Sequence, residues 1–431
     1  MSDTHAESIA FVRETSLPPV APPDKVGGPL KWVKDNLFPT WANAILTIVA
    51  LYFLYLLVSG SLPWLLNGVW SASSLSECRE ILDGATGACF SVLSERWHQL
   101  LFGFKYPSDQ YWRPTLALVL LFLAAAPVLF IDLPRKLLLF TGVYPFLAFW
   151  LIWGGPIWGP IFALLGVVAG YVVYSRLVQK SFAMALAGGV VAAVIVWYIG
   201  GFIGEALRPA SPLLQSIPSR DLGGFMLNMM LGITCVSLSL PIGIALALGR
   251  QSHLPIVKGI CVVFIEFVRG VPLITLLFVA NVMLAYFFPP GSGVDLFIRV
   301  VIMITMFSSA YIAEVIRGGL AALPKGQYEA ADSLGLDYPQ AMRLIILPQA
   351  LKISIPGIVN TFIGLFKDTT LVSVIGLLDP VGIINPIRAD SNWNGIVWEF
   401  YVFVGLFFWV FCFAMSRYSM YLERKLATDH R

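Results

Sequence analysis

Long apolar segments recur along the chain, and they restrict its possible folds more than any other feature. A helix needs about 20 apolar residues to cross roughly 30 Å of hydrocarbon, and hydropathy predicts about ten such spans. Only 12% of the residues are charged, compared with about 25% in a soluble domain. We therefore expect an all-α integral membrane protein. The predicted spans are residues 40–63, 113–132, 137–154, 157–175, 183–204, 223–248, 256–288, 296–317, 347–377 and 395–420, of which 256–288 is too long for one simple crossing and contains Pro272.

The N-terminal residues, 1–36, are polar and rich in proline. A cleavable signal peptide places a short apolar core near the start, whereas the first apolar run here begins near Trp41 and is long enough to stay as an anchor. The net charge is only +3, which gives no indication of nucleic-acid binding. The four histidines are scattered without metal-ligand spacing, so we expect no metal site.

Lysine and arginine gather in every second connection between the predicted spans. Such clusters mark the cytoplasmic side, so we expect both termini in the cytoplasm of a bacterium and the chain in its inner membrane. The other connections also hold arginines, but in longer loops where the rule is weaker. The basic residues that set this orientation are Lys25, Lys31, Lys34, Arg135, Lys136, Arg176, Lys180, Arg250, Lys258, Lys325, Arg343, Arg417, Arg424 and Lys425.

Two membrane parts follow the cytoplasmic tail. Residues 37–205 hold five spans with few ionisable residues and include an outward loop, 64–112. Residues 220–425 hold the other five spans, which contain charges, prolines and a long cytoplasmic loop, so function is expected there. Two glycine pairs in the first part have the spacing of closely packed helices, namely Gly166 with Gly170 and Gly200 with Gly204.

The outward loop contains two cysteines, Cys78 and Cys89, eleven residues apart. An oxidising periplasm permits a disulfide between them. The alternative is two free thiols in a flexible loop, because the geometry of the pair cannot be checked from sequence.

The cytoplasmic loop, residues 318–348, has the punctuation of two short helices. Proline favours a helix start and glycine a position just past its end, which predicts a helix from Pro324 to Leu334 stopped by Gly335. Asp337 then caps a second helix, with Gln340 completing a capping box. These helices either form a contact for another protein, entered through the slim Ala330-Ala331 surface, or serve as an ordinary connector.

The spacing in this loop resembles the EAA signature of permease subunits of ATP-binding-cassette (ABC) importers. Glu-Ala-Ala is followed by glycine six residues after the Glu, then nine residues, then Ile-Ile-Leu-Pro. The resemblance implies that the loop docks on an ATPase subunit and that residues 220–425 form a type I ABC importer permease core. The implied ATPase interface comprises Pro324, Lys325, Gly326, Gln327, Tyr328, Glu329, Ala330, Ala331, Asp332, Gly335, Leu336, Arg343, Ile345, Leu347 and Pro348.

More narrowly, the second part is similar to the polar amino-acid uptake branch of these permeases. The stretches that carry this likeness are 267–273, 310–318, 325–327 and 367–371. The five extra N-terminal spans and the outward loop resemble the long permease subunits of general L-amino-acid uptake systems. One departure is Thr369-Thr370, where Thr-Ser or Asn-Ser is frequent; the hydroxyls are retained.

Charges inside the spans form a second group of candidates. Two Glu/Arg pairs three residues apart can each neutralise themselves on one helix face, and a straight helix puts Arg269 about 16 Å in, near mid-membrane. A polar run, 367–370, lies between Pro356 and Gly376, which are expected to break the helix beside a cavity. We predict a gate or substrate path at Glu266, Arg269, Glu314, Arg317, Lys367, Asp368, Thr369 and Thr370, although Glu314 with Arg317 is also interpreted as a salt bridge that anchors the docking loop.

The energy source must lie outside this chain, because the GxxxxGK[ST] phosphate loop is missing from the sequence. We expect two partner ATPase subunits that bind ATP and Mg, no cofactor in this chain, a second permease subunit, a periplasmic amino-acid-binding protein and membrane lipid. The predicted function is import of L-amino acids by alternating access. The alternatives are an ion-coupled transporter, which needs inverted repeats, and an intramembrane enzyme, which needs a nucleophile or metal ligands within the spans.

Overall fold

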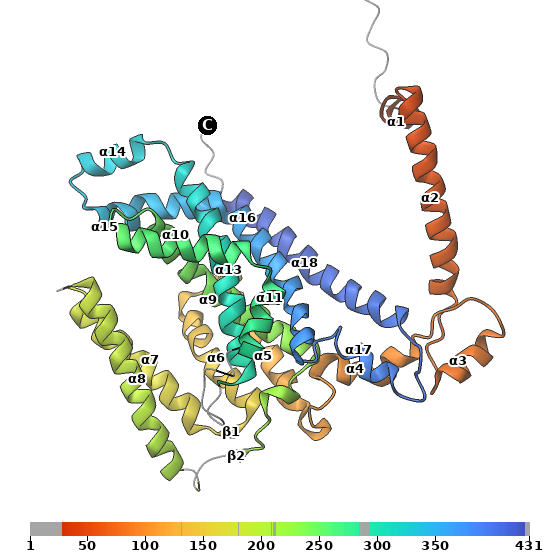
Figure 1. The fold of residues 1–431 in the computed structure, drawn as a ribbon, viewed down its shortest axis with the longest axis horizontal. Coiled ribbons are helices and arrows are strands. Elements are labelled where there is room, and N and C mark those ends of the chain that lie inside the picture. The colour runs from red at the N-terminus through yellow and green to blue at the C-terminus, as the bar shows by residue number, and fades with distance from the viewer. Residues whose placement is uncertain are drawn as a thin grey trace, which may run out of the picture. The chain divides into compact units, whose positions relative to one another are not determined.

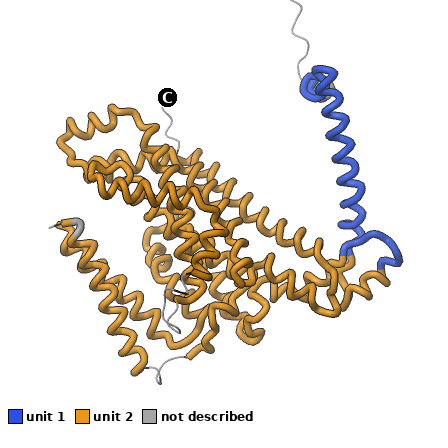
Figure 2. The backbone as a smooth tube through the Cα atoms, in the orientation of Figure 1, with its two compact units in different colours: residues 1–68, 82–88 blue, residues 69–81, 89–431 orange. Residues whose placement is uncertain are grey.

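The computed structural model describes residues 28–130, 132–179, 181–207, 209, 213–283, 286 and 294–426. The chain forms two compact units (Figure 2), residues 1–68 with 82–88 and residues 69–81 with 89–431. Most of the predicted cytoplasmic tail, 1–36, lies outside the described residues. Residues 89–205, which the sequence separates from the permease core, share the second unit with that core.

The first unit is built on one long membrane helix. Helix α1 (Pro29–Leu37) precedes α2 (Trp41–Leu66), whose first turn is capped by Thr40 Oγ1, which accepts a hydrogen bond from the Asn43 backbone N–H at 3.3 Å. No described residue of α2 is buried. A helix that is apolar on all sides is suited to lipid, so α2 is the N-terminal anchor that the hydropathy predicts.

The rest of the described chain is almost entirely helical (Figure 1). Its outward-loop and extension elements are α3 (Leu75–Leu82), α4 (Ser91–Phe102), η1 (Ser108–Gln110), α5 (Trp112–Leu129), η2 (Arg135–Leu137), α6 (Leu138–Trp153), β1 (Gly155–Pro156), α7 (Trp158–Leu177), α8 (Phe182–Ala206) and β2 (Leu213–Leu214). Its later elements are η4 (Ser219–Asp221), α9 (Gly224–Arg250), α10 (Pro255–Gly270), α11 (Leu273–Phe278), η5 (Val279–Met283), α13 (Leu296–Ala321), α14 (Gly326–Ser333), α15 (Tyr338–Ala341), η6 (Met342–Ile346), α16 (Leu347–Asp368), η7 (Thr369–Ile375), α17 (Ile384–Arg388) and α18 (Trp398–Leu426).

Nine helices within the described ranges are long and apolar enough to cross a membrane, and a bent pair brings the number to ten. The all-α class with about ten spans is therefore confirmed. The bend falls in the segment that is too long for one crossing: α10 meets α11 and η5 at 102°, directly after Gly270. Pro272 lies in this break and precedes α11. Proline has no backbone N–H to donate to the preceding turn of a helix.

Glycines set the closest helix contacts. In the α7–α8 hairpin, a Cβ at Gly166 would lie 2.8 Å from the Ala193 carbonyl oxygen, and one at Gly170 would lie 2.7 Å from that of Gly189. In the core, a Cβ at Gly319 of α13 would lie 2.6 Å from the Ala350 carbonyl oxygen of α16. Any Cβ at these three positions would clash with a backbone carbonyl, so glycine allows the paired helices to approach this closely.

The helices of the second unit have two shared ends. We call the end that carries α14 and α15 the loop end and the opposite end the far end. Arg250 at the end of α9 pairs with Glu314 near the end of α13, and Lys425 at the end of α18 pairs with Asp132 after α5. Helix α13 leads directly into the docking loop, so α9, whose Arg250 pairs with Glu314, ends there as well. Figure 1 shows α18 running from beside α17 toward the end that carries α14, and the Lys425–Asp132 pair brings the end of α5 to the same end.

Candidate functional site

The loop between α13 and α16 is a helix–turn–helix held against the core. Gln349 Nε2 of α16 donates to Gln327 Oε1 of α14 at 2.9 Å. Ala331 is fully buried, and Tyr328 packs against the apolar cluster formed by α9, α10, α13 and α16. Helix α14 is therefore coupled to α16 through the Gln327–Gln349 bond and to the apolar cluster through Tyr328.

The turn between the two helices has the geometry that the sequence predicts. Gly335 has φ +69°, the left-handed conformation that stops a helix. The Gln340 backbone N–H donates to Asp337 Oδ1 at 2.9 Å, and the Asp337 N–H donates to Gln340 Oε1 at 3.3 Å, which completes the capping box. Helix α14 is shorter than predicted, Gly326–Ser333, and the second helix continues as a π-helix at η6.

Most residues of the predicted ATPase interface lie on the surface. Ala331 is the exception that revises the expected slim Ala330-Ala331 surface, because Ala330 is exposed whereas Ala331 faces the core. The exposed residues are Pro324, Lys325, Gly326, Glu329, Ala330, Asp332, Gly335, Arg343 and Pro348, and the half-buried ones are Gln327, Tyr328, Leu336, Ile345 and Leu347.

Three apolar residues of this surface were missed by the sequence reasoning. Leu334, Tyr338 and Leu344 expose 72%, 56% and 63% of their areas. Large apolar side chains on a polar face typically mark a protein–protein contact. Leu334 and Tyr338 flank the turn and Leu344 lies in η6, so the sequence shows three apolar residues near the predicted interface. Their exposure depends on how the two short helices fold back.

The two predicted Glu/Arg pairs form one ion network. Glu314 pairs with Arg317 on its own helix and lies 3.4 Å from Arg250 and 3.8 Å from Arg269. Glu266 lies 2.7 Å from Arg250 and 4.0 Å from Arg269. The sequence reasoning treated Arg250 only as an orientation signal, because the meeting of α9 with α10 and α13 is a tertiary contact.

The predicted depth of Arg269 counts the helix rise from Lys258, and α10 is continuous over that distance, with the 102° bend directly after Gly270. Arg269 lies at the loop end, beside Glu314, with its guanidinium carbon 5.6 Å from the centre of the Tyr311 ring. The network thus joins the ends of α9, α10 and α13 at the base of the docking loop.

The polar run Lys367–Thr370 lies away from this network. Helix α16 begins at the loop and has 22 residues, so the run lies roughly 33 Å along it, toward the far end. The α-helix changes to 3₁₀ geometry at Thr369 and stops at Gly376, with φ +92°. Pro356, expected to break the helix, lies inside continuous α16.

Both hydroxyls of this run bond to their own helix. Thr369 Oγ1 donates to the Phe366 carbonyl oxygen at 2.7 Å, and Thr370 Oγ1 donates to that of Lys367 at 2.9 Å. Thr369 is buried, Asp368 is half-buried and Lys367 is exposed.

Buried polar groups in α9 and α13 were also missed. Both amide atoms of Asn228 and the hydroxyls of Thr305 and Ser308 are buried without a hydrogen-bond partner among the described residues. Such groups are rare because each one costs desolvation energy. Uncharged polar residues give no distinctive sequence signal within a span.

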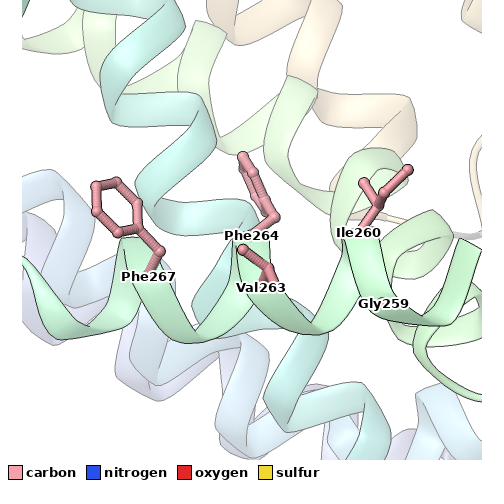
Figure 3. A pocket seen from close by; sticks show the side chains of 5 residues that line it. All are labelled: Gly259, Ile260, Val263, Phe264 and Phe267. Carbon is pink, nitrogen blue, oxygen red and sulfur yellow. The ribbon is translucent and has the colours of Figure 1, made fainter. Parts of the chain in front are cut away.

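An apolar groove runs along α10. It is lined by Gly259, Ile260, Val263, Phe264 and Phe267, and Figure 3 shows these side chains standing on one helix. A zwitterionic amino acid needs polar partners when it leaves water. The groove therefore lacks the chemistry of a cargo site.

Comparison with known proteins identifies the family. The sequence pattern of the "binding-protein-dependent transport system inner membrane component" family matches residues 239–428. The glutamate/glutamine/aspartate/asparagine transport system permease protein BztC of Rhodobacter capsulatus is 56% identical over 440 residues, covering 100% of both chains. The inner membrane amino-acid ABC transporter permease protein YhdY of Escherichia coli is 40% identical, covering 92% of this chain and 93% of that one.

Among solved structures, a crystal structure of an amino acid ABC transporter with histidines is 32% identical, covering 46% of this chain and 90% of that chain, with a TM-score of 0.41. The ion-coupled alternative gains no support from any of these relatives. Proteins of this kind lie in the inner membrane and work with separate subunits that hydrolyse ATP and with a substrate-binding protein. The chain is a multi-pass member of the binding-protein-dependent inner membrane components, a permease subunit of the amino-acid ABC transporter family.

Proposed function

We propose that this permease imports acidic L-amino acids and their amides by alternating access, driven by an ATPase that docks on α14. The observation that carries the proposal is an exposed docking helix with the family signature, on a chain that matches an acidic amino-acid and amide permease over its full length. Alternating access requires that the ATPase displace α14, and this helix has contacts through which such a displacement reaches the spans.

The docking contact combines charge and apolar area. Glu329 and Ala330 are exposed on α14, and Leu334, Tyr338 and Leu344 add apolar area around the turn. Fully desolvated apolar anchors surrounded by polar groups are the usual source of binding energy in interfaces. We assign the ATPase interface to this face of α14 and α15.

An acidic amino acid carries two carboxylates and one ammonium group, and its amide form has a neutral amide in place of the second carboxylate. Lys367 supplies a cation and Thr370 lies beside it on the next turn. We assign the run Lys367–Thr370 to the substrate path, and the network of Glu266, Arg269, Glu314 and Arg317 to a gate at the loop end. Changing the charges of this gate should alter coupling, because it joins α10 and α13 beside the docking loop.

The working complex has two ATPase subunits, which bind ATP and Mg, and a second permease subunit, similar or identical. The basic connections at the ends of α5, α9, α13 and α18 share the loop end. By the positive-inside rule this end faces the cytoplasm, with both termini on that side. A periplasmic binding protein then delivers cargo at the far end.

Co-purification with the ATPase tests the proposal. The complex, reconstituted with binding protein, should hydrolyse ATP faster when glutamate, glutamine, aspartate or asparagine is present, and should accumulate them in vesicles. Glu329→Arg should dissociate or uncouple the ATPase while membrane insertion stays intact, with the exposed Glu80→Gln as a control. Normal uptake by Glu329→Arg would contradict the docking assignment, and uptake in vesicles lacking the ATPase would contradict the energy source.

A further inference from the structure

We propose that residues 69–81, 89–130 and 132 brace α18 at both of its ends, so that α18 stays fixed to this part of the second unit while α13 and α16 move. Arg96, Glu95 and Asp132 are then positioning residues of the transport cycle. The inference rests on the proposed function, since it assigns a role within ATP-driven transport. It gives the outward loop and the first span of the second unit a mechanical task.

At the far end, the brace holds the first turn of α18 through a buried carboxylate. Glu399 is only 8% exposed, and its Oε1 accepts a hydrogen bond from the Cys89 backbone N–H at 3.1 Å. Cys89 is joined to Cys78 by a disulfide, and Ser91 Oγ lies 3.1 Å and 3.2 Å from the two sulfurs. The start of α18 is thus bonded to a backbone that cannot move freely.

The segment that leads into α18 is held by side chains of α4. Arg96 Nη2 lies 2.8 Å from Asp390 Oδ2, and Trp393 Nε1 donates to Glu95 Oε2 at 3.0 Å. Trp393 is fully buried. Two neighbouring residues of α4 therefore hold the first half of the connection between α17 and α18, about 300 positions later in the chain.

The brace is itself anchored to the core by backbone contact. A Cβ at Gly103, which follows α4, would lie 2.7 Å from the Gly223 nitrogen, and the Gly224 N–H donates to the Leu378 carbonyl oxygen at 2.8 Å. Gly103 and Gly224 have φ +105° and +62°, values that favour glycine. The end of α4 therefore sits directly on the start of α9.

At the loop end, the chain after α5 holds the last turns of α18. Lys425 Nζ lies 2.6 Å from Asp132 Oδ2, and Tyr418 Oη donates to the Leu129 carbonyl oxygen at 2.7 Å. The ion pair and the tyrosine bond lie about two helix turns apart, so together they fix the position of the last turns of α18.

The docking loop shares α9 with the brace and differs from it at α18. The apolar cluster that receives Tyr328 is built from α9, α10, α13 and α16, with their connections, and contains no residue of α18. The hydrogen bond of Gln327 likewise reaches α16. A displacement of α14 by the ATPase is therefore passed to α13 and α16, while α18 is held by the brace. The contact that changes during transport is then the one between α16 and α18.

Crosslinking separates the fixed contacts from the moving one. Three cysteine pairs are made with Cys235, Cys261 and Cys412 replaced by serine and the Cys78–Cys89 disulfide kept, and each is joined by a short bis-maleimide in the full complex. Two pairs lock the brace, Arg96→Cys with Asp390→Cys and Asp132→Cys with Lys425→Cys. The third locks α16 to α18, Phe366→Cys with Phe411→Cys, whose native rings lie 5.9 Å apart.

Each locked complex is compared with the same variant left unlocked. The two brace locks should keep at least half of the ATP hydrolysis and amino-acid uptake, whereas the α16–α18 lock should reduce both at least tenfold. A brace lock that abolishes ATP hydrolysis, or an α16–α18 lock that leaves it unchanged, would overturn the inference. Failure of the unlocked complex to take up any amino acid would instead contradict the proposed function. The inference would still be tested then, by comparing ATP hydrolysis in the locked and unlocked complexes.

Discussion

Asp379 is an acidic side chain that the fold buries completely, in the turn after η7. Its Oδ1 accepts the Gly382 N–H at 2.8 Å and its Oδ2 accepts the Val381 N–H at 3.2 Å. Desolvation outweighs these bonds and raises the pKa of Asp379 to about 6. In the unfolded chain an aspartate has a pKa near 3.9, so the folded form holds its proton more tightly.

This shift predicts a pH-dependent stability. Between about pH 4 and 6 the folded state binds more protons than the unfolded state, so stability falls as pH rises, by up to about 3 kcal/mol. Asp379→Asn stays neutral and should lose this decline, while the exposed Glu80→Gln should keep it. Thermal unfolding in detergent at pH 4.5 and 7.5 measures both, and equal pH slopes for Asp379→Asn and the natural protein would refute the prediction.

The ion network predicts unequal roles for its two glutamates. Glu314 forms ion pairs with three arginines and exposes 22% of its side chain, whereas Glu266 forms ion pairs with two arginines and exposes 53%. Glu314→Gln should therefore lower the free energy of unfolding by roughly 1–2 kcal/mol, and Glu266→Gln by less than about 1 kcal/mol. Denaturation of the detergent-solubilised protein compares them, and a larger loss for Glu266→Gln would reverse the ranking.

At the scale of elements, the turn between α14 and α15 depends on one backbone conformation. A Cβ at Gly335 would meet no described atom within 4 Å, so Gly335→Ala tests only the cost of φ +69°, about 1 kcal/mol. That strain should reorient α14 and weaken ATPase binding about fivefold. Gly364→Ala in α16 is the matched control, because its site is also open, its φ is not positive and it lies outside the docking loop. Equal affinities of the two variants in a pull-down titration would show that the turn does not set the docking geometry.

At the scale of the whole molecule, a small disulfide supports a contact between distant parts of the chain. Cys78 and Cys89 are separated by 11 positions, and closing a loop of this length stabilises a fold by about 3 kcal/mol. Replacing both by alanine should lower the unfolding midpoint in oxidising buffer, and reductant should remove the difference. The free Cys412→Ala serves as a control. An unchanged midpoint for the double variant would show that the hydrogen bond of Glu399 does not need the disulfide.

Much of this protein was determined by local sequence. The spans follow from apolar length and the docking turn from Gly335, Asp337 and Gln340, because each depends on neighbours within a few positions. The family likewise follows from the spacing of the docking loop.

Only the tertiary structure decided how distant segments meet. It joined Arg250 to two predicted pairs, turned Ala331 inward, and set Cys89 and Asp132 against α18, about 300 positions later. Such contacts depend on which helix faces meet and at what angle, as at Arg269, which reaches Glu314 of α13 one residue before α10 ends and the chain bends by 102°. Hydropathy records how apolar a segment is, and it contains no information about which neighbour that segment will touch.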